Sequence, residues 1–229
     1  MSASSTVIDG PALTAAVERI AARLVEITDL LNQLDGAMGD GDLGITAGKG
    51  AAALLAYLAA TPPGADLGRS LSELGLAFNR AASSTMGALV ATALMRAGKE
   101  ARGLAALDGP TLARMLAAAD AGVQERGKAK PGDKTLVDAL HPAAEAFAAA
   151  VAQGASLAVA AQALLLAARA GRDAVIPLRS KMGRAGWVGE RSANQPDAGT
   201  VLFVNVVEAA LSPSPTQPGQ AAGLASSAT

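Results

Sequence analysis

The chain has 229 residues, and its 19 lysines and arginines against 20 aspartates and glutamates give a formal net charge of −1. This length corresponds to one domain, or two at most. The charge balance lacks the basic excess of a nucleic-acid-binding surface, so we expect no nucleic-acid partner. The absence of cysteine excludes disulfides, thiolate metal ligands and cysteine nucleophiles, and a single histidine excludes histidine-rich zinc sites. Alanine, the best helix former, dominates the hydrophobic 51% of residues, which predicts an all-α protein.

The sequence also predicts a cytoplasmic protein without a membrane partner. Met1 to Asp9 lacks the basic start and apolar run of a signal peptide. The uncharged stretch over residues 147–168 is interrupted by two glutamines, a glycine and a serine. We therefore interpret it as the end of one helix and the start of another rather than as a membrane span.

Eight helices are predicted along the chain, separated by short segments containing Gly, Pro or Asp. The first opens at Pro11 and keeps apolar residues at three- and four-residue spacing until Asp35-Gly36. The other seven are expected over residues 46–60, 66–82, 85–101, 108–123, 131–153, 156–170 and 198–211. No period-two strand pattern is found. Short loops between helices predict an up-and-down antiparallel bundle over residues 1–211, and the tail 212–229, rich in Ser, Pro, Gly and Ala, is predicted to be disordered.

The segment from Leu34 to Gly44 is the strongest candidate for a functional site. It contains three aspartates, Asp35, Asp40 and Asp42, interleaved with four glycines. Close carboxylates repel one another unless a cation neutralises them, and oxygen ligands without His or Cys favour Mg²⁺ or Ca²⁺. The spacing fits neither an EF-hand nor a Walker A loop. The alternative interpretation makes Asp40 and Asp42 turn and helix-cap residues.

Four blocks of sequence resemble the nucleotide-binding L subunit of dihydroxyacetone kinase, which also forms the C-terminal domain of single-chain, ATP-dependent dihydroxyacetone kinases. The blocks are LNQLD (31–35) with GDGDLG (39–44), MGAL (86–89), GDKTLVDAL (132–140), and GRA through GERS (183–192). They occur in the family's order and cover about residues 10–211. The resemblance implies a barrel of eight antiparallel amphipathic helices, with the nucleotide at one end where the loops meet.

The resemblance also implies a ligand set. Asp35, Asp40 and Asp42 would hold two Mg²⁺ ions against the phosphates of ADP or ATP. The start of the second helix would contact the nucleotide through free amides, because a helix N-terminus attracts anions. The implied nucleotide contacts are Leu43, Gly44, Ile45, Thr46, Thr85, Met86, Gly127, Thr135, Leu136, Arg184, Asp197, Ala198 and Gly199.

Several of these positions have a plain structural alternative or depart from the family's pattern. The run Ser83-Ser84-Thr85 can be an N-cap, and Asp133 and Thr135 can be capping residues after Pro131. The departures are Met86 in place of a hydroxyl residue, Gln195 where the family usually has His, and Ala198 within an Asp-Pro-Gly segment.

Four further features are interpreted as structural. His141, the single histidine, is expected to be structural or solvent-exposed. Trp187, where the family carries an aromatic residue, is expected to be a buried anchor rather than a contact to a lid or a partner subunit. The lysines expected to be solvated surface charges are Lys49, Lys128, Lys130 and Lys134.

The resemblance implies a subunit that transfers a phosphoryl group from Mg-nucleotide to dihydroxyacetone, or a related small hydroxyketone, held by a separate dihydroxyacetone-binding subunit. No catalytic residue is expected on this chain, except that Arg184 is a candidate, because catalysis would consist of positioning and charge neutralisation. The phosphate source stays open between ATP and a phosphotransferase-system phosphodonor protein. The alternatives are a non-catalytic nucleotide-sensing or interaction module, and a purely structural helical scaffold.

Overall fold

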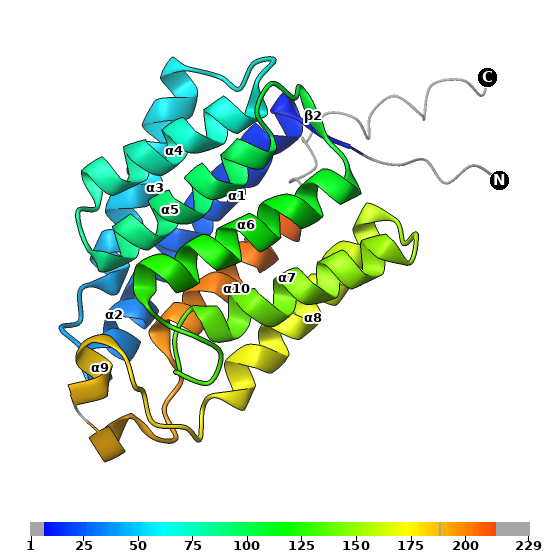
Figure 1. Ribbon diagram of the computed structural model, residues 1–229. Coiled ribbons are helices and arrows are strands. Elements are labelled where there is room, and N and C mark those ends of the chain that lie inside the picture. The colour runs from blue at the N-terminus through cyan, green and yellow to red at the C-terminus, as the bar shows by residue number, and fades with distance from the viewer. Residues whose placement is uncertain (1–6, 188, 214–229) are drawn as a thin grey trace, which may run out of the picture.

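The computed structural model describes residues 7–187 and 189–213. Within these ranges the chain is almost entirely helical (Figure 1). The helices are α1 (Gly10–Glu26), α2 (Thr28–Met38), α3 (Leu43–Ala60), α4 (Leu67–Ala81), α5 (Thr85–Glu100), α6 (Gly109–Gly127), α7 (Val137–Ala152), α8 (Leu157–Ala174), α9 (Gly183–Trp187), the 3-10 helix η1 (Gly189–Ser192) and α10 (Ala198–Leu211). Two short strands, β1 (Ile8–Asp9) and β2 (Ala106–Leu107), pair antiparallel.

Eight of the helices form a closed ring. In ring order they are α1, α3, α4, α5, α6, α7, α8 and α10, and α10 packs back against α1. Successive ring helices run up and down, as Figure 1 shows, so the connections alternate between two ends of the barrel. The predicted all-α barrel of eight antiparallel helices is confirmed. One consequence is that α3, α5, α7 and α10 all begin at the same end, which we call the loop end.

The predicted helices correspond to observed ones, with one correction near the start. The first predicted helix is two helices, because the chain bends at Ile27 between α1 and α2. The Thr28 hydroxyl donates to the Leu24 carbonyl at 3.1 Å, and this type of bond to the preceding turn bends helices. The bend places α2 at the loop end, beside η1.

The sequence patterns missed the smallest elements. β1, β2, α9 and η1 were not predicted, because two to five residues are too few to show a hydrophobic period. The sixth predicted helix begins later than expected, at Val137 rather than near Pro131. The tail 212–229 was predicted to be disordered, and residues 214–229 of it lie outside the described residues.

Helix starts are fixed by capping side chains. In six helices a side-chain oxygen accepts a hydrogen bond from an amide of the first turn, and Pro11 and Pro110 occupy first-turn positions of α1 and α6. The caps are Asp9, Asp66, Ser84, Asp108, Ser156 and Asp197. The ring helices α3 and α7 start without a bond from their own N-cap side chain, and both start at the loop end.

Apolar side chains fill most of the barrel. The main cluster joins α1, α3, α4, α5, α6 and α10 through residues such as Leu24, Leu54 and Leu74, and a second joins α7, α8 and α10 around Phe147. The interior also holds a cavity of about 340 Å³ lined only by apolar side chains, from Val17 on α1 to Leu202 on α10. Burial of these apolar faces is the main source of stability for the ring.

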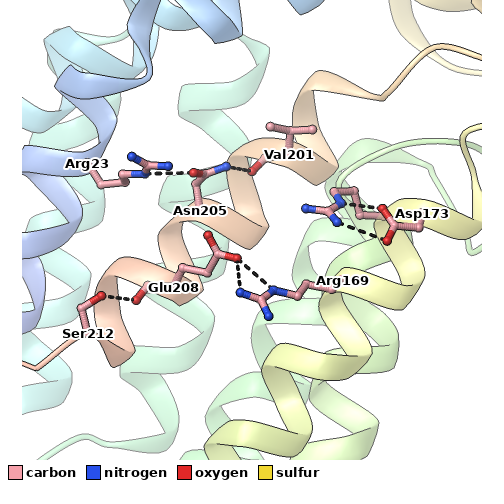
Figure 2. Close-up of polar contacts among 8 residues, drawn as sticks. Arg23, Arg169, Asp173, Val201, Asn205, Glu208 and Ser212 are labelled. Carbon is pink, nitrogen blue, oxygen red and sulfur yellow. Dashed lines mark hydrogen bonds and ion pairs between the residues drawn. The ribbon is translucent and has the colours of Figure 1, made fainter.

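The ring closes through polar contacts around α10 (Figure 2). Arg23 of α1 donates to the Asn205 side chain at 2.9 Å, and Asn205 in turn donates to the Val201 carbonyl. On the opposite side, Arg169 of α8 reaches Glu208 with two hydrogen bonds of 2.9 and 2.7 Å. These contacts fix the position of α10 between its two neighbours, whereas the free energy comes mainly from the apolar clusters.

One helix in the described part of the chain, α3, is long and apolar enough to cross a membrane by length and composition alone. It packs between α1 and α4 in the ring, and Ala47, Ala51 and Leu54 on it are buried in the core. Its composition is therefore accounted for by burial within the barrel. The stretch over residues 147–168 is split between α7 and α8, as predicted.

His141 is structural, which agrees with its interpretation from the sequence. Its Nδ1 atom lies 2.8 Å from Asp120 Oδ2 and joins α7 to α6, while Nε2 lies 3.5 Å from Glu145. The hydrogen bond with Asp120 raises the pKa of His141 although partial burial opposes this. The imidazole therefore belongs to the packing of these two helices.

Candidate functional site

A pocket of about 640 Å³ opens at the loop end of the barrel. Its walls come from four connections that are far apart in sequence: α2 to α3, α4 to α5, α6 to α7, and α8 to α10. The first residues of α3, α5, α7 and α10 also line it, among them Leu43, Thr85, Val137 and Ala198. Four helix N-termini, each carrying partial positive charge, therefore converge on one pocket.

Three carboxylates face these N-termini. Asp35, Asp40 and Asp42 each offer an oxygen, and these oxygens all lie within 4.8 Å of one another. All three line the pocket, with Asp40 and Asp42 exposed to it and Asp35 partly buried. Carboxylate oxygens this close favour a hard divalent cation such as Mg²⁺. The donor set fits the predicted metal site.

The amides at the start of α3 already have acceptors inside the chain. Asp35 Oδ2 accepts from the amides of Asp42 and Leu43 at 3.0 and 3.3 Å. Asn32 Oδ1 accepts from those of Gly44 and Ile45 at 2.8 and 3.2 Å. The expectation that free amides there would bind phosphate is therefore wrong for this arrangement. The predicted contact residues Gly44 and Ile45 also lie outside the pocket wall, whereas Leu43 and Thr46 line it.

Asn32 is a site residue that the sequence patterns did not single out. It lies on α2 and caps α3, so it ties the helix before the acidic loop to the helix after it. The close packing of α2 against the start of α3 requires glycine at position 44, because a Cβ there would lie 2.0 Å from the Thr28 carbonyl oxygen. The glycine and the asparagine together fix the fold of the acidic loop.

In the Ser/Thr run before α5, Ser84 caps the helix and Thr85 lines the pocket. Ser84 is the N-cap and accepts from the Gly87 amide at 3.0 Å, so the capping interpretation holds for that position. Thr85 is exposed in the pocket wall and keeps its hydroxyl available. Met86 lines the same wall and also packs against the main core cluster.

The connection between α6 and α7 supplies the next wall, including the predicted residues Gly127, Thr135 and Leu136. Thr135 also acts as a cap, because its hydroxyl oxygen accepts from the Val137 amide at 3.2 Å. Asp138, buried in the first turn of α7, accepts from the amides of Thr135 and Gly132. The loop is therefore held by the Asp138 carboxylate and can present a fixed surface to a ligand.

Asp197, Ala198 and Gly199, three of the predicted contact residues, line the pocket at the start of α10. Asp197 caps this helix by accepting from the Thr200 amide at 2.7 Å. Burial raises the pKa of the Asp197 carboxyl to about 6, and the nearby Asp138 adds to this, while the Thr200 amide and Lys134 act in the opposite direction. A carboxyl group with a raised pKa therefore lines the same pocket as the acidic cluster.

Three predictions for the remaining residues have different outcomes. Lys134 is not a solvated surface charge: it is 1% exposed and lies at the back of the pocket. Trp187 is not a buried anchor, because 86% of it is exposed at the end of α9. Arg184 lies on α9, next to the pocket-lining residues Gly183 and Ala185, but its side chain is outside the described part of the structure.

An acidic cluster beneath converging helix N-termini, at one end of a closed helical barrel, is the arrangement that places this chain in a class of proteins. The sequence of residues 37–212 matches the DAK2 domain family. The chain belongs to this family, and it is a DhaL-like protein.

The individual relatives agree with this assignment. The chain is 30% identical over 179 residues to the PEP-dependent dihydroxyacetone kinase, ADP-binding subunit DhaL of Escherichia coli, a match that covers 77% of this chain and 85% of that subunit. It is 32% identical over 201 residues to the triokinase/FMN cyclase of Mus musculus, covering 88% of this chain. The match spans about a third, 34%, of that longer protein.

Crystal structures of the C. freundii dihydroxyacetone kinase have the same fold. The native form superposes with a TM-score of 0.68 and 27% identity, covering 92% of this chain and 36% of the other. The complex with AMP-PNP and Mg²⁺ gives a TM-score of 0.66 at 24% identity, with the same coverage. The predicted resemblance to the L subunit of dihydroxyacetone kinase is confirmed.

The raised pKa of Asp197 predicts a pH-dependent stability. The folded chain holds a proton on Asp197 up to about pH 6, whereas an ordinary aspartate releases it near 3.8. The unfolding free energy should therefore lose a contribution as pH rises between these values. Asp197→Asn keeps the capping oxygen and cannot ionise, so its stability relative to the unmodified chain should be higher at pH 7 than at pH 4.

Urea unfolding at the two pH values measures this difference. Asp173→Asn is the control. A hydrogen bond from Arg172 lowers the pKa of Asp173, so the contribution of its carboxylate to stability is lost only as the pH falls below about 4. That variant should show no relative gain between pH 4 and pH 7. An Asp197→Asn variant whose relative stability does not change with pH would contradict the assignment.

Proposed function

We propose that this chain is the nucleotide-binding part of a kinase, which holds ADP or ATP with two Mg²⁺ ions at the loop end of the barrel. In this proposal the γ-phosphoryl group of ATP, bound as such or formed on bound ADP by a phosphodonor protein, passes to a hydroxyl of dihydroxyacetone, or of a related small hydroxyketone, held by a separate subunit. The hydroxyl loses its proton, and ADP is the leaving group. One observation carries the proposal: three clustered carboxylates and four helix N-termini face the same pocket. The carboxylates favour a cation, and the starts of α5, α7 and α10 favour an anion, whereas the amides at the start of α3 already donate to Asp35 and Asn32. A Mg-nucleotide supplies both a cation and an anion.

The residues of the pocket support distinct roles. Asp35, Asp40 and Asp42 would ligate the metal, and the metal would neutralise charge on the transferring phosphoryl group. Thr46 and Thr85 offer hydroxyls at the starts of α3 and α5, so they are suited to phosphate contacts. Gly127, Thr135 and Leu136 would flank the base, and Asp197 to Gly199 would close over the nucleotide, with Arg184 near its phosphates.

A separate ketone-binding subunit is proposed from the chemistry of the pocket. Its described lining contains neither histidine nor cysteine, and its one lysine, Lys134, is buried. The residues present can position a nucleotide and neutralise its charge, but they offer no covalent hold on a ketone. The E. coli relative carries the name of an ADP-binding subunit, which supports the same division of labour.

Asp40→Ala tests the metal assignment. Removing one of three clustered carboxylates should weaken Mg-ADP binding by at least about a hundredfold, because each metal–carboxylate bond is lost together with its charge. Helical content should not change, since Asp40 lies in an exposed loop between α2 and α3. Isothermal calorimetry with ADP and Mg²⁺ gives the affinity, and circular dichroism gives the helical content.

The matched control is Asp29→Ala, which removes an exposed aspartate from the first turn of α2, away from the pocket wall. Its affinity for Mg-ADP should equal that of the unmodified chain. Equal affinity in the Asp40→Ala variant would show that Asp40 does not ligate the metal.

Phosphoryl transfer is tested by adding a dihydroxyacetone-binding subunit to the purified chain. Formation of dihydroxyacetone phosphate with ATP as the only donor is the expected result for an ATP-dependent pair. Formation of product only with a phosphotransferase-system phosphodonor protein would identify that protein, rather than ATP, as the phosphate source. A chain that binds Mg-ADP but supports no transfer with either donor would instead be the nucleotide-sensing module, and the kinase proposal would fail.

A further inference from the structure

Lys134 has a backbone conformation that its residue type does not favour. Its φ is +60°, in the left-handed region that is unfavourable for a non-glycine residue. Two residues earlier, Gly132 has φ +90°, where glycine removes that cost. A side chain at position 134 therefore has to compensate for the strain through its contacts.

Those contacts use the whole ammonium group. A lysine ammonium has three N–H donors, and each donates to a different backbone carbonyl. The acceptors are the oxygens of Ile176, Leu178 and Ser192, at 2.9, 2.8 and 2.6 Å. Burial lowers the pKa of Lys134, and the nearby Asp197 carboxylate partly offsets this. With no donor left over, the ammonium is not available to bind phosphate directly.

The three acceptors belong to one segment, residues 176–187 and 189–192, which we call the cover segment. It runs from the end of α8 through α9 and η1, and its residues Ser180, Met182 and Gly183 line the pocket. Figure 1 shows α9 and η1 at the loop end, beside α2. Because Ile176 and Ser192 lie at its two ends, Lys134 joins both ends of the segment to the loop before α7.

Ser192 reinforces the same junction. Its side chain is fully buried, accepts from the Ser180 amide at 2.9 Å and donates to the Gly189 carbonyl at 2.6 Å. The Lys181 amide also donates to the Asp133 carbonyl at 3.1 Å. The base of the cover segment is thus fixed on the loop that carries Lys134, while its middle lines the pocket.

We propose that Lys134 is a positioning residue that holds the cover segment over the pocket and thereby sets how tightly the Mg-nucleotide is retained. The part concerning nucleotide retention rests on the proposed function. The part concerning the cover segment stands on the chain alone. Without the ammonium, one buried carbonyl and two partly buried ones would lose their donor together, and the segment would open toward solvent to satisfy them.

The test compares four variants of the full chain. Lys134→Met keeps the apolar stem and removes the donors, Lys134→Gln keeps two donors on a shorter neutral group, and Lys134→Arg keeps the charge. Lys181→Met is the matched control, because Lys181 bridges the same two segments from an exposed position through Gly132 and Asp133. Circular dichroism first establishes that each variant is folded. Should Lys134→Met not fold, Lys134→Gln takes its place.

Amide hydrogen exchange without nucleotide measures the cover segment directly. In Lys134→Met, peptides covering residues 176–192 should exchange about tenfold faster or more, since three hydrogen bonds from a charged, buried donor are lost. Peptides from α1 and α4 should exchange as in the unmodified chain, and Lys181→Met should change neither. Unchanged exchange in residues 176–192, or a uniform increase over the whole barrel, would overturn the proposal.

Calorimetry with Mg-ADP measures retention. Affinity should fall about tenfold or more in Lys134→Met and recover most of this in Lys134→Arg, with no change in Lys181→Met. A merely stabilising lysine would leave the affinity of the folded variant unchanged, and that result would also overturn the proposal. If the unmodified chain binds no Mg-ADP, the proposed function fails, and the exchange measurement alone decides whether Lys134 fixes the cover segment.

Discussion

Three negatively charged carboxylates lie in one pocket with the positive ends of four helix dipoles, and the rest of the loop end depends on this arrangement. It arises from the closed ring, because eight helices that alternate in direction bring the starts of α3, α5, α7 and α10 together at one end. Each local feature there serves this arrangement: Asn32 and Gly44 fix the acidic loop, Asp138 fixes the loop before α7, and Lys134 fixes the cover segment. A metal ion and a phosphate group together match the charges that result.

The barrel was predictable because its helices are long, capped and amphipathic. Asp66, Ser84 and Asp108 are the kind of residue that starts a helix, and each caps the helix that follows it. The order of helices around the ring came from the resemblance, since periodicity shows which face of a helix is buried but not which helix covers it. The bend at Ile27 was missed because α1 and α2 share one continuous apolar stripe, and the bond from Thr28 to the preceding turn leaves that stripe intact.

The site was predictable in part. The aspartates stand out in the sequence because three carboxylates within eight positions need a cation, and the structure brings them together. Lys134 could not be recognised, since a lysine between Asp133 and Thr135 has the composition of an exposed turn, and its carbonyl acceptors lie more than forty residues away. Asn32 lies in the LNQLD block, but its role depends on hydrogen bonds across the loop between α2 and α3, which no local pattern reveals. Exposure of Trp187 depends on how α9 is placed, which follows from the cover segment as a whole.

Calorimetric titration of the unmodified chain with ADP, once with Mg²⁺ and once with EDTA, tests the central claim most directly. The claim is that cation and anion are bound together in the pocket at the loop end. It predicts tight binding with Mg²⁺ and binding that is lost with EDTA, because without the metal the nucleotide phosphates would face the three carboxylates unshielded. Binding of equal strength in both conditions, or no binding in either, would contradict the account.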